Sequence, residues 1–424
     1  MSIFLRSVEK NTCVNPFCFV FRFGHGTTDM DRLRFFVFRK LLAGCTFKTG
    51  LLRVLTLVFR PVVVTVLSFR CLRRFYRPIK KTFGIGKVRF FFSMLWVCLT
   101  HHVTPMYYCR HQFYQKESGD YDAYLFGNEA SVLLPQLNDD PCSDIVDDKE
   151  KFYEICAANG LPIPLIFGVI GTDGTAPEFL HEDIVVKPVR GSKGEGMEIW
   201  KYQNERYIGP EENVPDASSL FDVLRSRVCT DGNRLIVQRR LWNHPALVDL
   251  SKSALITVRI VTYRDPEGAF RVLNECLILP LEGESGGIRQ AVAPILEDTG
   301  RLGVAVPYGV IRKELAIHPV YGLPILDVPV PFREESRSLA IRAHSFFPDF
   351  FSLGWDIAIT GDGPIILETN RVWDAETAQR PNRRPISQTD WISAAVTVVR
   401  NKKSVKFAGD RSIDGGTCGS SDGS

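Results

Sequence analysis

The sequence GWDIAITGDGPIILETN at residues 354–370 specifies more of the architecture than any other stretch of this chain. Two apolar runs flank the turn sequence Gly-Asp-Gly at 361–363, which predicts a β-hairpin with a three-residue loop. In that register Asp356 lies directly opposite Glu368, and both carboxylates point to the same face. Opposed side chains are about 5 Å apart, and like charges there are destabilising. The hairpin is therefore expected to hold a cation between Asp356 and Glu368.

Asn370 supplies a third oxygen on this face, because residues two apart in a strand point the same way. Two carboxylates and an amide oxygen form a hard-oxygen site that suits Mg²⁺, with Mn²⁺ as the alternative ion. The predicted metal ligands are thus Asp356, Glu368 and Asn370. An exposed hairpin whose carboxylates are simply solvated is the alternative, and two further motifs favour the metal site.

The first of these motifs is DIVVKPVRGSKGEGMEIW at residues 183–200. An apolar run leads to Lys187, and a loop with three glycines within six positions follows. Lys187 could lie over the phosphates of a nucleotide while the backbone N–H groups of 191–196 surround them. A strand, a turn and a solvated lysine would give the same pattern, and the loop is neither a Walker A loop nor a GxGxxG turn.

The second motif is the strand-like sequence ITVRIVTY at 256–263, which places Arg259 in an apolar setting. A guanidinium there requires a planar anion, and a phosphoryl group in transfer is one. A structural Asp or Glu would satisfy Arg259 equally well.

Charge is divided unevenly along the chain. Residues 1–116 hold 20 of the 52 Lys and Arg residues but only three acidic residues, Glu9, Asp29 and Asp31, so this region carries +17 and the remainder −13. Such an asymmetry predicts a basic, mostly helical N-terminal region that meets an anionic partner.

Arg53, Arg60 and Arg70 interrupt the first apolar run of this region, and the second, at 90–100, is too short to cross a bilayer. A buried or interfacial helix is therefore expected in place of a span. A basic cluster could contact an anionic membrane surface or pack on the acidic remainder. Its members are Arg70, Arg73, Arg74, Arg77, Lys80 and Lys81. Nucleic acid is disfavoured as a partner, because no recognised binding module is present.

The remaining patterns predict ordinary α/β elements. The stretch at 146–164 predicts a helix with Asp147 and Glu150 as its capping box and Asn159-Gly160 at its end. Strands are expected at 184–187, 235–238, 256–263, 270–279, 355–360 and 364–369. Further helices are expected near 218–227, 333–346 and 388–399.

The predicted organisation is a basic region at 1–116, a main domain at 117–400 and a disordered Gly/Ser-rich tail at 401–424. Within the main domain, subdomains are expected at about 143–240 and 241–400. The eleven cysteines form no CxxC pair, which indicates reduced thiols and a cytoplasmic protein, with attachment to the membrane periphery as a second option.

In their order and spacing these motifs resemble the ATP-grasp superfamily, and within it the sugar-transfer-associated branch, which is similar to α-L-glutamate ligases. The resemblance runs from about Ser143 to Trp391. It is carried by DK at 148–149, GLPIP, VVKP with GSKGEGM, LIVQRRLWNHPAL, ITVRIVT, GGI, DTGRL and GWDIAI with ILETN. The resemblance implies an ATP-grasp fold, in which two α+β subdomains grip ATP.

The resemblance also implies roles for named residues. Lys149 and Lys187 would bind the nucleotide, Arg259 and Lys187 would act in phosphoryl transfer, and the hairpin would hold magnesium. The loop over the phosphates would comprise Gly191, Ser192, Lys193, Gly194 and Gly196. The adenine hinge would comprise Gln238, Arg239 and Leu241.

The activity that the resemblance implies is an ATP- and Mg²⁺-dependent ligase. A carboxylate would form an acyl phosphate, which an amine or similar nucleophile would capture, with a small-molecule or glycan-related acceptor. Two alternatives stay open: phosphotransfer to a hydroxyl by the same site, and a non-catalytic nucleotide-binding scaffold.

Overall fold

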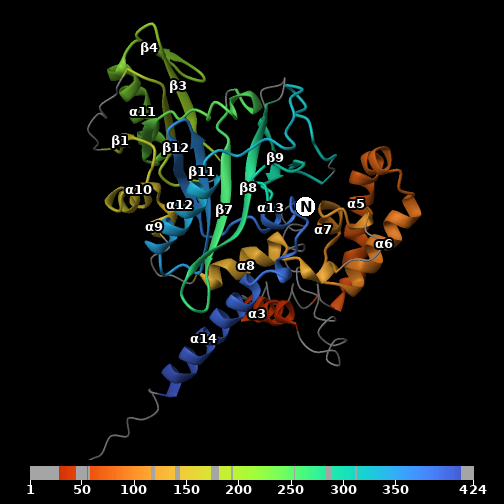
Figure 1. The fold of residues 1–424 in the computed structure, drawn as a ribbon. Helices are drawn as coiled ribbons and strands as arrows, with labels where there is room; N and C mark the ends of the chain where they lie inside the picture. Colours follow the sequence, from red (N-terminus) through yellow and green to blue (C-terminus); the bar gives the residue numbers. More distant parts are fainter. Residues whose placement is uncertain are drawn as a thin grey trace, which may run out of the picture.

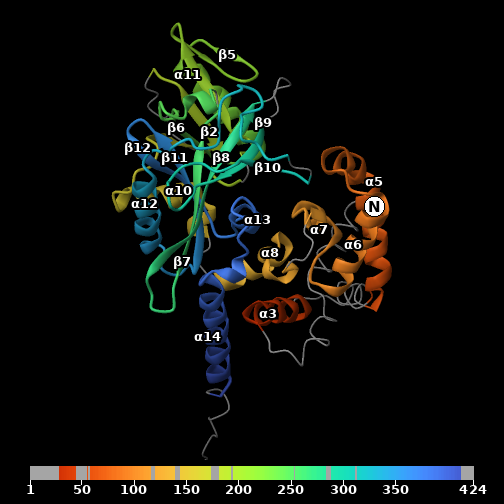
Figure 2. The same ribbon diagram turned by 45° about the vertical axis from the view of Figure 1, so that its right-hand side comes forward.

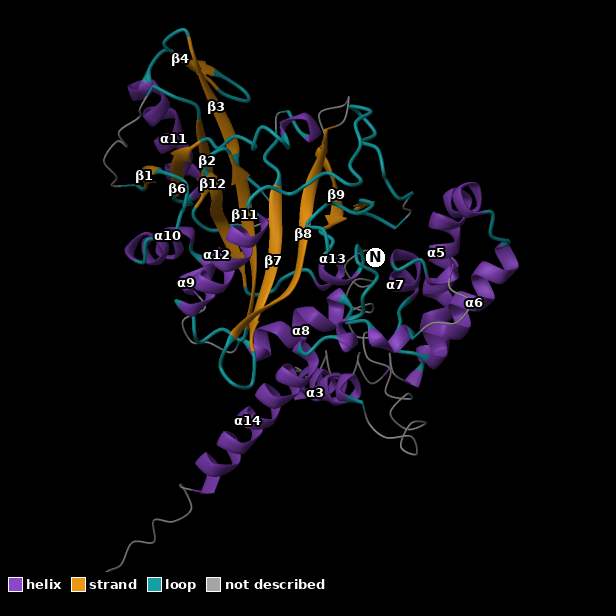
Figure 3. Ribbon diagram, viewed as in Figure 1, coloured by secondary structure: helices purple, strands orange, loops and turns teal. Residues whose placement is uncertain are grey.

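The computed structural model describes residues 28–411 apart from 44–54, 56–57, 116–119, 139–143, 173–180, 192–193, 253, 283–287 and 311–312. Two six-stranded antiparallel sheets form the centre of this described part, and helices pack against them (Figures 1 and 3). This arrangement confirms the predicted α/β (α+β) class, with two subdomains preceded by helices from the N-terminal region.

The first sheet has the strand order β1-β6-β2-β3-β4-β5. Its strands are β1 (Ile166–Ile170), β2 (Ile184–Pro188), β3 (Glu198–Gln203), β4 (Arg206–Ile208), β5 (Asn213–Val214) and β6 (Leu235–Arg239). Helix α11 (Ala217–Asp231) covers one face, because Leu220, Leu224 and Val228 recur at every fourth residue and are fully buried against the sheet. The other face is turned toward the second subdomain, where Ile236 joins its core.

The second sheet has the order β10-β9-β8-β7-β11-β12. Its strands are β7 (Thr257–Arg264), β8 (Phe270–Glu282), β9 (Ile288–Pro294), β10 (Val306–Pro307), β11 (Ser352–Thr360) and β12 (Gly363–Asn370). Helix α12 (Arg333–Ser345) buries Leu339 and Ala343 against one face, next to Trp355. Helix α10 (Lys149–Ala158) adds Phe152, whose ring stacks on Phe347 with centroids 5.7 Å apart. These aromatic contacts join the two subdomains through one core.

The predicted strands and helices of the main domain are all present. Their bounds agree within a few residues, except that the helix expected at 388–399 extends to Arg411. The strands that the sequence did not predict include β4 and β5, which have three and two residues. Segments this short cannot show an alternating pattern.

The hairpin of β11 and β12 differs from its prediction at the turn. Thr360 pairs with Gly363, so the loop has two residues where three were expected. That register alone would pair Glu368 with Trp355. A β-bulge at Leu367 shifts β12 by one residue, and Asp356 does pair with Glu368 as predicted.

The start of helix α10 also differs from its prediction. The N-cap is Asp148, whose carboxylate accepts hydrogen bonds from the backbone N–H groups of Glu150 and Lys151. Asp147, expected in a capping box with Glu150, instead forms an ion pair with Arg371 at 2.9 Å. The two adjacent aspartates are equivalent by sequence pattern, and tertiary contacts decide between them.

Helices from both ends of the chain share one core beside and below the second sheet (Figure 2). They are α3 (Asp29–Ala43), α8 (Gly127–Leu137), α13 (Ala375–Gln379) and α14 (Trp391–Arg411). Leu33 and Val37 of α3 are buried beside Ala395 of α14. Part of the N-terminal region is thus built into the main domain.

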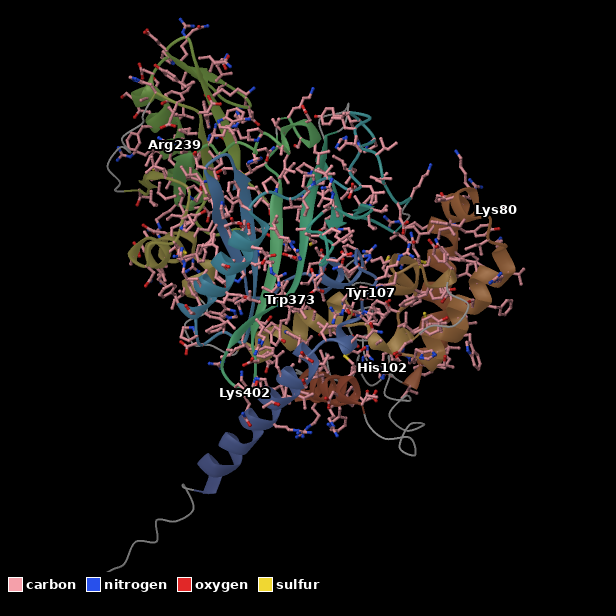
Figure 4. The ribbon with its side chains drawn as sticks, in the orientation of Figure 1. Lys80, His102, Tyr107, Arg239, Trp373 and Lys402 are labelled. Carbon is pink, nitrogen blue, oxygen red and sulfur yellow. The ribbon has the colours of Figure 1, made fainter. Side chains whose placement is uncertain are left out.

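The expected disordered tail is wrong at its start, because α14 continues through 401–411. Lys402 anchors the start of this extension, because its Nζ atom donates to the carbonyl oxygens of Gln136 and Leu137 at the end of α8 (Figure 4). Positive side chains stabilise the free carbonyl groups at a helix C-terminus. Residues 412–424 lie outside the described residues.

The remaining N-terminal helices form a layer at the side of the molecule (Figures 1 and 2). They are α5 (Arg60–Phe83), α6 (Lys87–Thr100) and α7 (Pro105–Arg110). In the described part of the chain, no single helix is long and apolar enough to cross a membrane, although α5 and α6 together meet the length and composition criteria as a pair bent by 119°.

Candidate active site

The centre of the site is a row of charged side chains across β7, β11 and β12. The sheet register places Arg259 next to Asp356, and Asp356 next to Glu368. Arg259 donates from Nε and Nη2 to both carboxylate oxygens of Asp356, each at 2.7 Å. In this bidentate ion pair, the planar Asp356 carboxylate neutralises the half-buried guanidinium of Arg259. The structure therefore joins the predicted catalytic arginine to a predicted metal ligand.

The electrostatics of Glu368 fit a cation site. Burial raises the pKa of Glu368, and the Asp356 carboxylate raises it further through its charge and a hydrogen bond, while Lys187 and Lys149 act in the opposite direction. Two neighbouring carboxyl groups favour sharing a proton when no cation separates them. A divalent ion with oxygen ligands can replace that proton.

Asn370 completes the predicted ligand set. It lies two residues beyond Glu368, on the same face of β12. Among the described residues, no group of three or more His, Cys, Asp or Glu side chains is placed to bind a metal ion. Magnesium binding would therefore depend on the amide oxygen of Asn370 as the third ligand.

Lys187 approaches the same region from β2 of the first sheet. Its Nζ atom donates a hydrogen bond of 2.7 Å to the hydroxyl group of Tyr153. Tyr153 in turn donates to the carbonyl oxygen of Leu367 at 2.6 Å, in the β-bulge that precedes Glu368. This chain of hydrogen bonds positions the lysine of one subdomain relative to the acidic hairpin of the other.

Tyr153 is a positioning residue that the sequence analysis missed. It lies four residues after Lys149 on α10, and residues at this spacing share one helix face. Its buried side chain could therefore have been assigned to the lysine side of the site.

We expect Tyr153→Phe to lower the free energy of unfolding by about 1–3 kcal/mol, because the variant leaves buried polar partners without a hydrogen bond. It should also weaken ATP binding several-fold, because Lys187 loses its anchor. Urea denaturation and calorimetry measure the two effects. Tyr202→Phe on β3 is the matched control, and equal behaviour of both variants would contradict the positioning role.

The charge of Lys187 should make ATP binding depend on pH. Burial lowers the pKa of Lys187 to about 8, although Glu368 opposes this shift. The ammonium form, which attracts phosphate, therefore predominates below pH 8 and is lost as the pH rises above it. We expect the affinity for ATP to fall by about tenfold per pH unit above pH 8. Lys187→Arg stays charged, so its calorimetric profile should be flat over this range; a wild-type profile equally flat would contradict the prediction.

Lys149 and the glycine-rich loop lie next to each other. Lys149 Nζ donates to the carbonyl oxygen of Gly191 at 2.8 Å, and burial lowers the pKa of Lys149. Gly194 and Gly196 both have φ of 71°, a conformation that favours glycine. Two predicted phosphate-loop residues, Ser192 and Lys193, lie outside the described residues.

The residues of the predicted adenine hinge do not all point to the same side of the first sheet. Gln238 lies on the same face of the first sheet as Lys187, since Lys187 pairs with Ile236 and Val185 with Gln238. Gln238 is buried, and within the described part of the chain its Oε1 atom has no hydrogen-bond partner. This acceptor suits the amino group of a purine. Leu241, three residues later in the chain, is half-buried.

Arg239 points away from this face. It pairs with Ile184, on the opposite side of the sheet from Lys187, and its guanidinium binds the Glu182 carboxylate at 2.7 and 2.9 Å (Figure 4). The side chain of Arg239 is thus not brought together with the other predicted nucleotide-binding residues. Alternation along β6 gives the physical reason, because neighbouring residues point to opposite faces.

Polar side chains near α13 lie beyond Arg259, at the end of the row away from Glu368. We call them the polar edge. Cys276 of β8 pairs with Arg259 in the sheet, and Arg259 also interacts electrostatically with Tyr308. The hydroxyl group of Tyr308 is 2.9 Å from that of Thr377, which donates to Asp374 at 2.7 Å. This edge thus brings three polar side chains, Tyr308, Thr377 and Asp374, to the neighbourhood of Arg259.

Two facing antiparallel sheets, with Lys187 on one and the row of Arg259, Asp356 and Glu368 on the other, define the ATP-grasp class of fold. The chain belongs to the sugar-transfer associated ATP-grasp family, whose model matches residues 128–390. No curated protein matches the sequence significantly. The family match supports an ATP-dependent, ligase-like enzyme.

The solved structures that match the chain have low sequence identity and low TM-scores. D-alanine–D-alanine ligase from Bacillus anthracis is 12% identical with a TM-score of 0.37, covering 61% of this chain and 70% of that one. An ATP-grasp RimK domain protein from Sphaerobacter thermophilus DSM 20745 is 13% identical with a TM-score of 0.30, covering 60% and 68%. A biotin carboxylase from Campylobacter jejuni is 12% identical with a TM-score of 0.34, covering 60% and 46%.

Proposed function

We propose that this protein is an ATP- and Mg²⁺-dependent ligase that activates a carboxylate and joins it to an amine or a similar nucleophile. One observation carries the proposal. Lys187 of one subdomain is linked by hydrogen bonds through Tyr153 to the carbonyl oxygen of Leu367 in the other. Leu367 directly precedes Glu368, which belongs to the row with Asp356 and Arg259. Cations and carboxylates so arranged can hold a polyphosphate and its metal ion between the sheets.

The residues of the chain would act mainly by positioning and charge. Lys149 and Lys187 would neutralise the phosphates, and the Gln238 side chain would accept a hydrogen bond from the purine. Asp356, Glu368 and Asn370 would hold Mg²⁺, which when bound neutralises phosphate charge. Arg259 would stabilise the negative charge that develops on the transferred phosphoryl group while its other contacts keep Asp356 in place.

The reaction would proceed in two steps. A substrate carboxylate oxygen attacks the γ-phosphorus, the bond to the ADP oxygen breaks, and an acyl phosphate forms. An amine then attacks the acyl carbon, phosphate leaves, and the amine loses a proton as the amide forms. The polar edge at Tyr308, Thr377 and Asp374 would receive the acceptor, which we take to be a small metabolite or a glycan-related molecule.

An isotope experiment tests this reaction. Candidate carboxylates labelled with ¹⁸O are incubated with ATP, Mg²⁺, an amine and the full chain, and the products are followed by phosphorus NMR. The proposal predicts one ¹⁸O atom in the released inorganic phosphate. A stable phosphoester would instead identify a phosphotransferase, and ATP binding without turnover with any acceptor would favour a non-catalytic protein.

A further inference from the structure

The helical hairpin of α5 and α6 lies at the outer edge of the molecule, on the side away from the sheets (Figures 1 and 2). The inner face of this hairpin is buried inside the protein. Phe75 and Ile79 of α5 and Phe90 and Met94 of α6 are buried against the segment that contains α7. Its outer face therefore does not serve the core of the protein.

The outer face is apolar over both helices. Val62, Val66 and Phe69 of α5 follow helical spacing and are exposed, with Phe69 at 55%. On α6, Phe92 and Trp96 are 60% and 68% exposed. The two apolar stripes meet, because the ring of Phe69 packs edge-on against the half-buried Phe91 with centroids 5.7 Å apart. The result is one continuous apolar surface of aromatic and β-branched side chains.

Basic side chains continue the same stripe. Arg73, Arg77 and Lys80 follow Phe69 along the exposed face of α5, and all are exposed (Figure 4 for Lys80). Residues 60–100 contain nine Lys and Arg residues and no Asp or Glu. The hairpin thus combines exposed aromatic residues with a charge of one sign.

We propose that the outer face of the α5–α6 hairpin binds the surface of an anionic phospholipid bilayer. Apolar side chains would enter the boundary between headgroups and acyl chains, and the basic side chains would contact phosphate and carboxylate headgroups. The bend of 119° between the helices suits a hairpin that lies in this boundary. The absence of acidic residues at 60–100 favours an anionic lipid surface over a neutral one.

The connection to the rest of the protein is firm. Arg110 of α7 forms an ion pair with Glu376 of α13 at 2.9 Å, and the hydroxyl group of Tyr107 accepts a hydrogen bond from the backbone N–H of Asn128 at 2.9 Å (Figure 4). Glu376 also binds Arg380 at 2.8 Å. A hairpin docked on a membrane would therefore carry the sheets with it.

Co-sedimentation of the full chain with vesicles tests the proposal. The vesicles are phosphatidylcholine alone or with about 30% phosphatidylserine. The apolar variant is Phe92→Ser with Trp96→Ser, and its control is Ile317→Ser with Val320→Ser, which are exposed in the second subdomain. The charge variant is Arg73→Glu with Arg77→Glu, and its control is Arg206→Glu with Arg225→Glu, which are exposed in the first subdomain.

We expect wild type to bind the anionic vesicles and each hairpin variant to lose at least about tenfold in partitioning, whereas both controls bind like wild type. Circular dichroism confirms that the variants are folded. The proposal is overturned if wild type ignores anionic vesicles, or if the hairpin variants and controls bind alike. It is also overturned if the apolar variant converts a dimer to a monomer without vesicle binding, or if the basic face binds only DNA.

Discussion

Glu368→Gln is expected to lower ATP-dependent turnover by about two to three orders of magnitude while the protein stays folded. The variant keeps the shape of the side chain but removes the charge that, together with Asp356, would bind Mg²⁺. Burial and the adjacent Asp356 raise the pKa of Glu368, so a neutral amide is tolerated in the folded protein. ADP release, measured over a series of Mg²⁺ concentrations, separates weaker metal binding from slower chemistry.

Asp362→Asn is the matched control for this experiment. Asp362 lies at the exposed tip of the same hairpin, and its charge should not influence the reaction. If Glu368→Gln and Asp362→Asn turned over ATP at the wild-type rate, the assignment of β12 to the metal site would be wrong.

Arg259→Met should have the largest effect on stability. The Nε and Nη2 atoms of Arg259 each donate to Asp356 at 2.7 Å, and the Asp356 side chain is only 9% exposed. Removal of the arginine leaves this carboxylate without its partner, which costs about 3–5 kcal/mol of unfolding free energy when a buried pair is broken on one side. Urea denaturation measures this loss, and ATP turnover should fall as well.

A double variant separates the two roles of Arg259. Arg259→Met combined with Asp356→Asn removes both charges, so most of the stability should return, because an amide needs no counter-ion. Turnover should stay low, since the phosphoryl-stabilising cation and a metal ligand are both missing. Arg264→Met, at the exposed end of the same strand, is the control. Recovery of turnover in the double variant would contradict a catalytic role for Arg259.

The register of the β11–β12 hairpin illustrates what the sequence could and could not predict. Alternating apolar residues and the turn sequence placed Asp356 opposite Glu368 correctly, but through a three-residue loop that does not exist. The true pairing depends on the bulge at Leu367. No residue type marks that bulge, and its carbonyl oxygen is satisfied by Tyr153 from a distant helix. Long-range contacts of this kind leave no local signal in the sequence.

The other differences are of two kinds. The direction of Arg239 follows from strand alternation once Lys187 and Gln238 are placed in register, so this correction could have been predicted. The burial of α3 against α14 could not, because the two helices lie at opposite ends of the chain. Removal of residues 1–116 would delete α3 and expose the side chains that share its core, such as Trp391 and Ala395 of α14. Experiments on this protein therefore require the full chain.

Binding of Mg²⁺-ATP to the full chain, measured by isothermal calorimetry, tests the central claim that the two subdomains grip a nucleotide. Lys187→Met removes the half-buried lysine of β2, and Lys201→Met removes an exposed lysine from β3 of the same sheet. We predict Mg²⁺-dependent binding by wild type and Lys201→Met, and a loss of about ten- to a hundredfold in Lys187→Met, as expected for one charge-assisted phosphate contact. Absence of binding by folded wild type at millimolar ATP, or equal affinity of the two variants, would contradict the account.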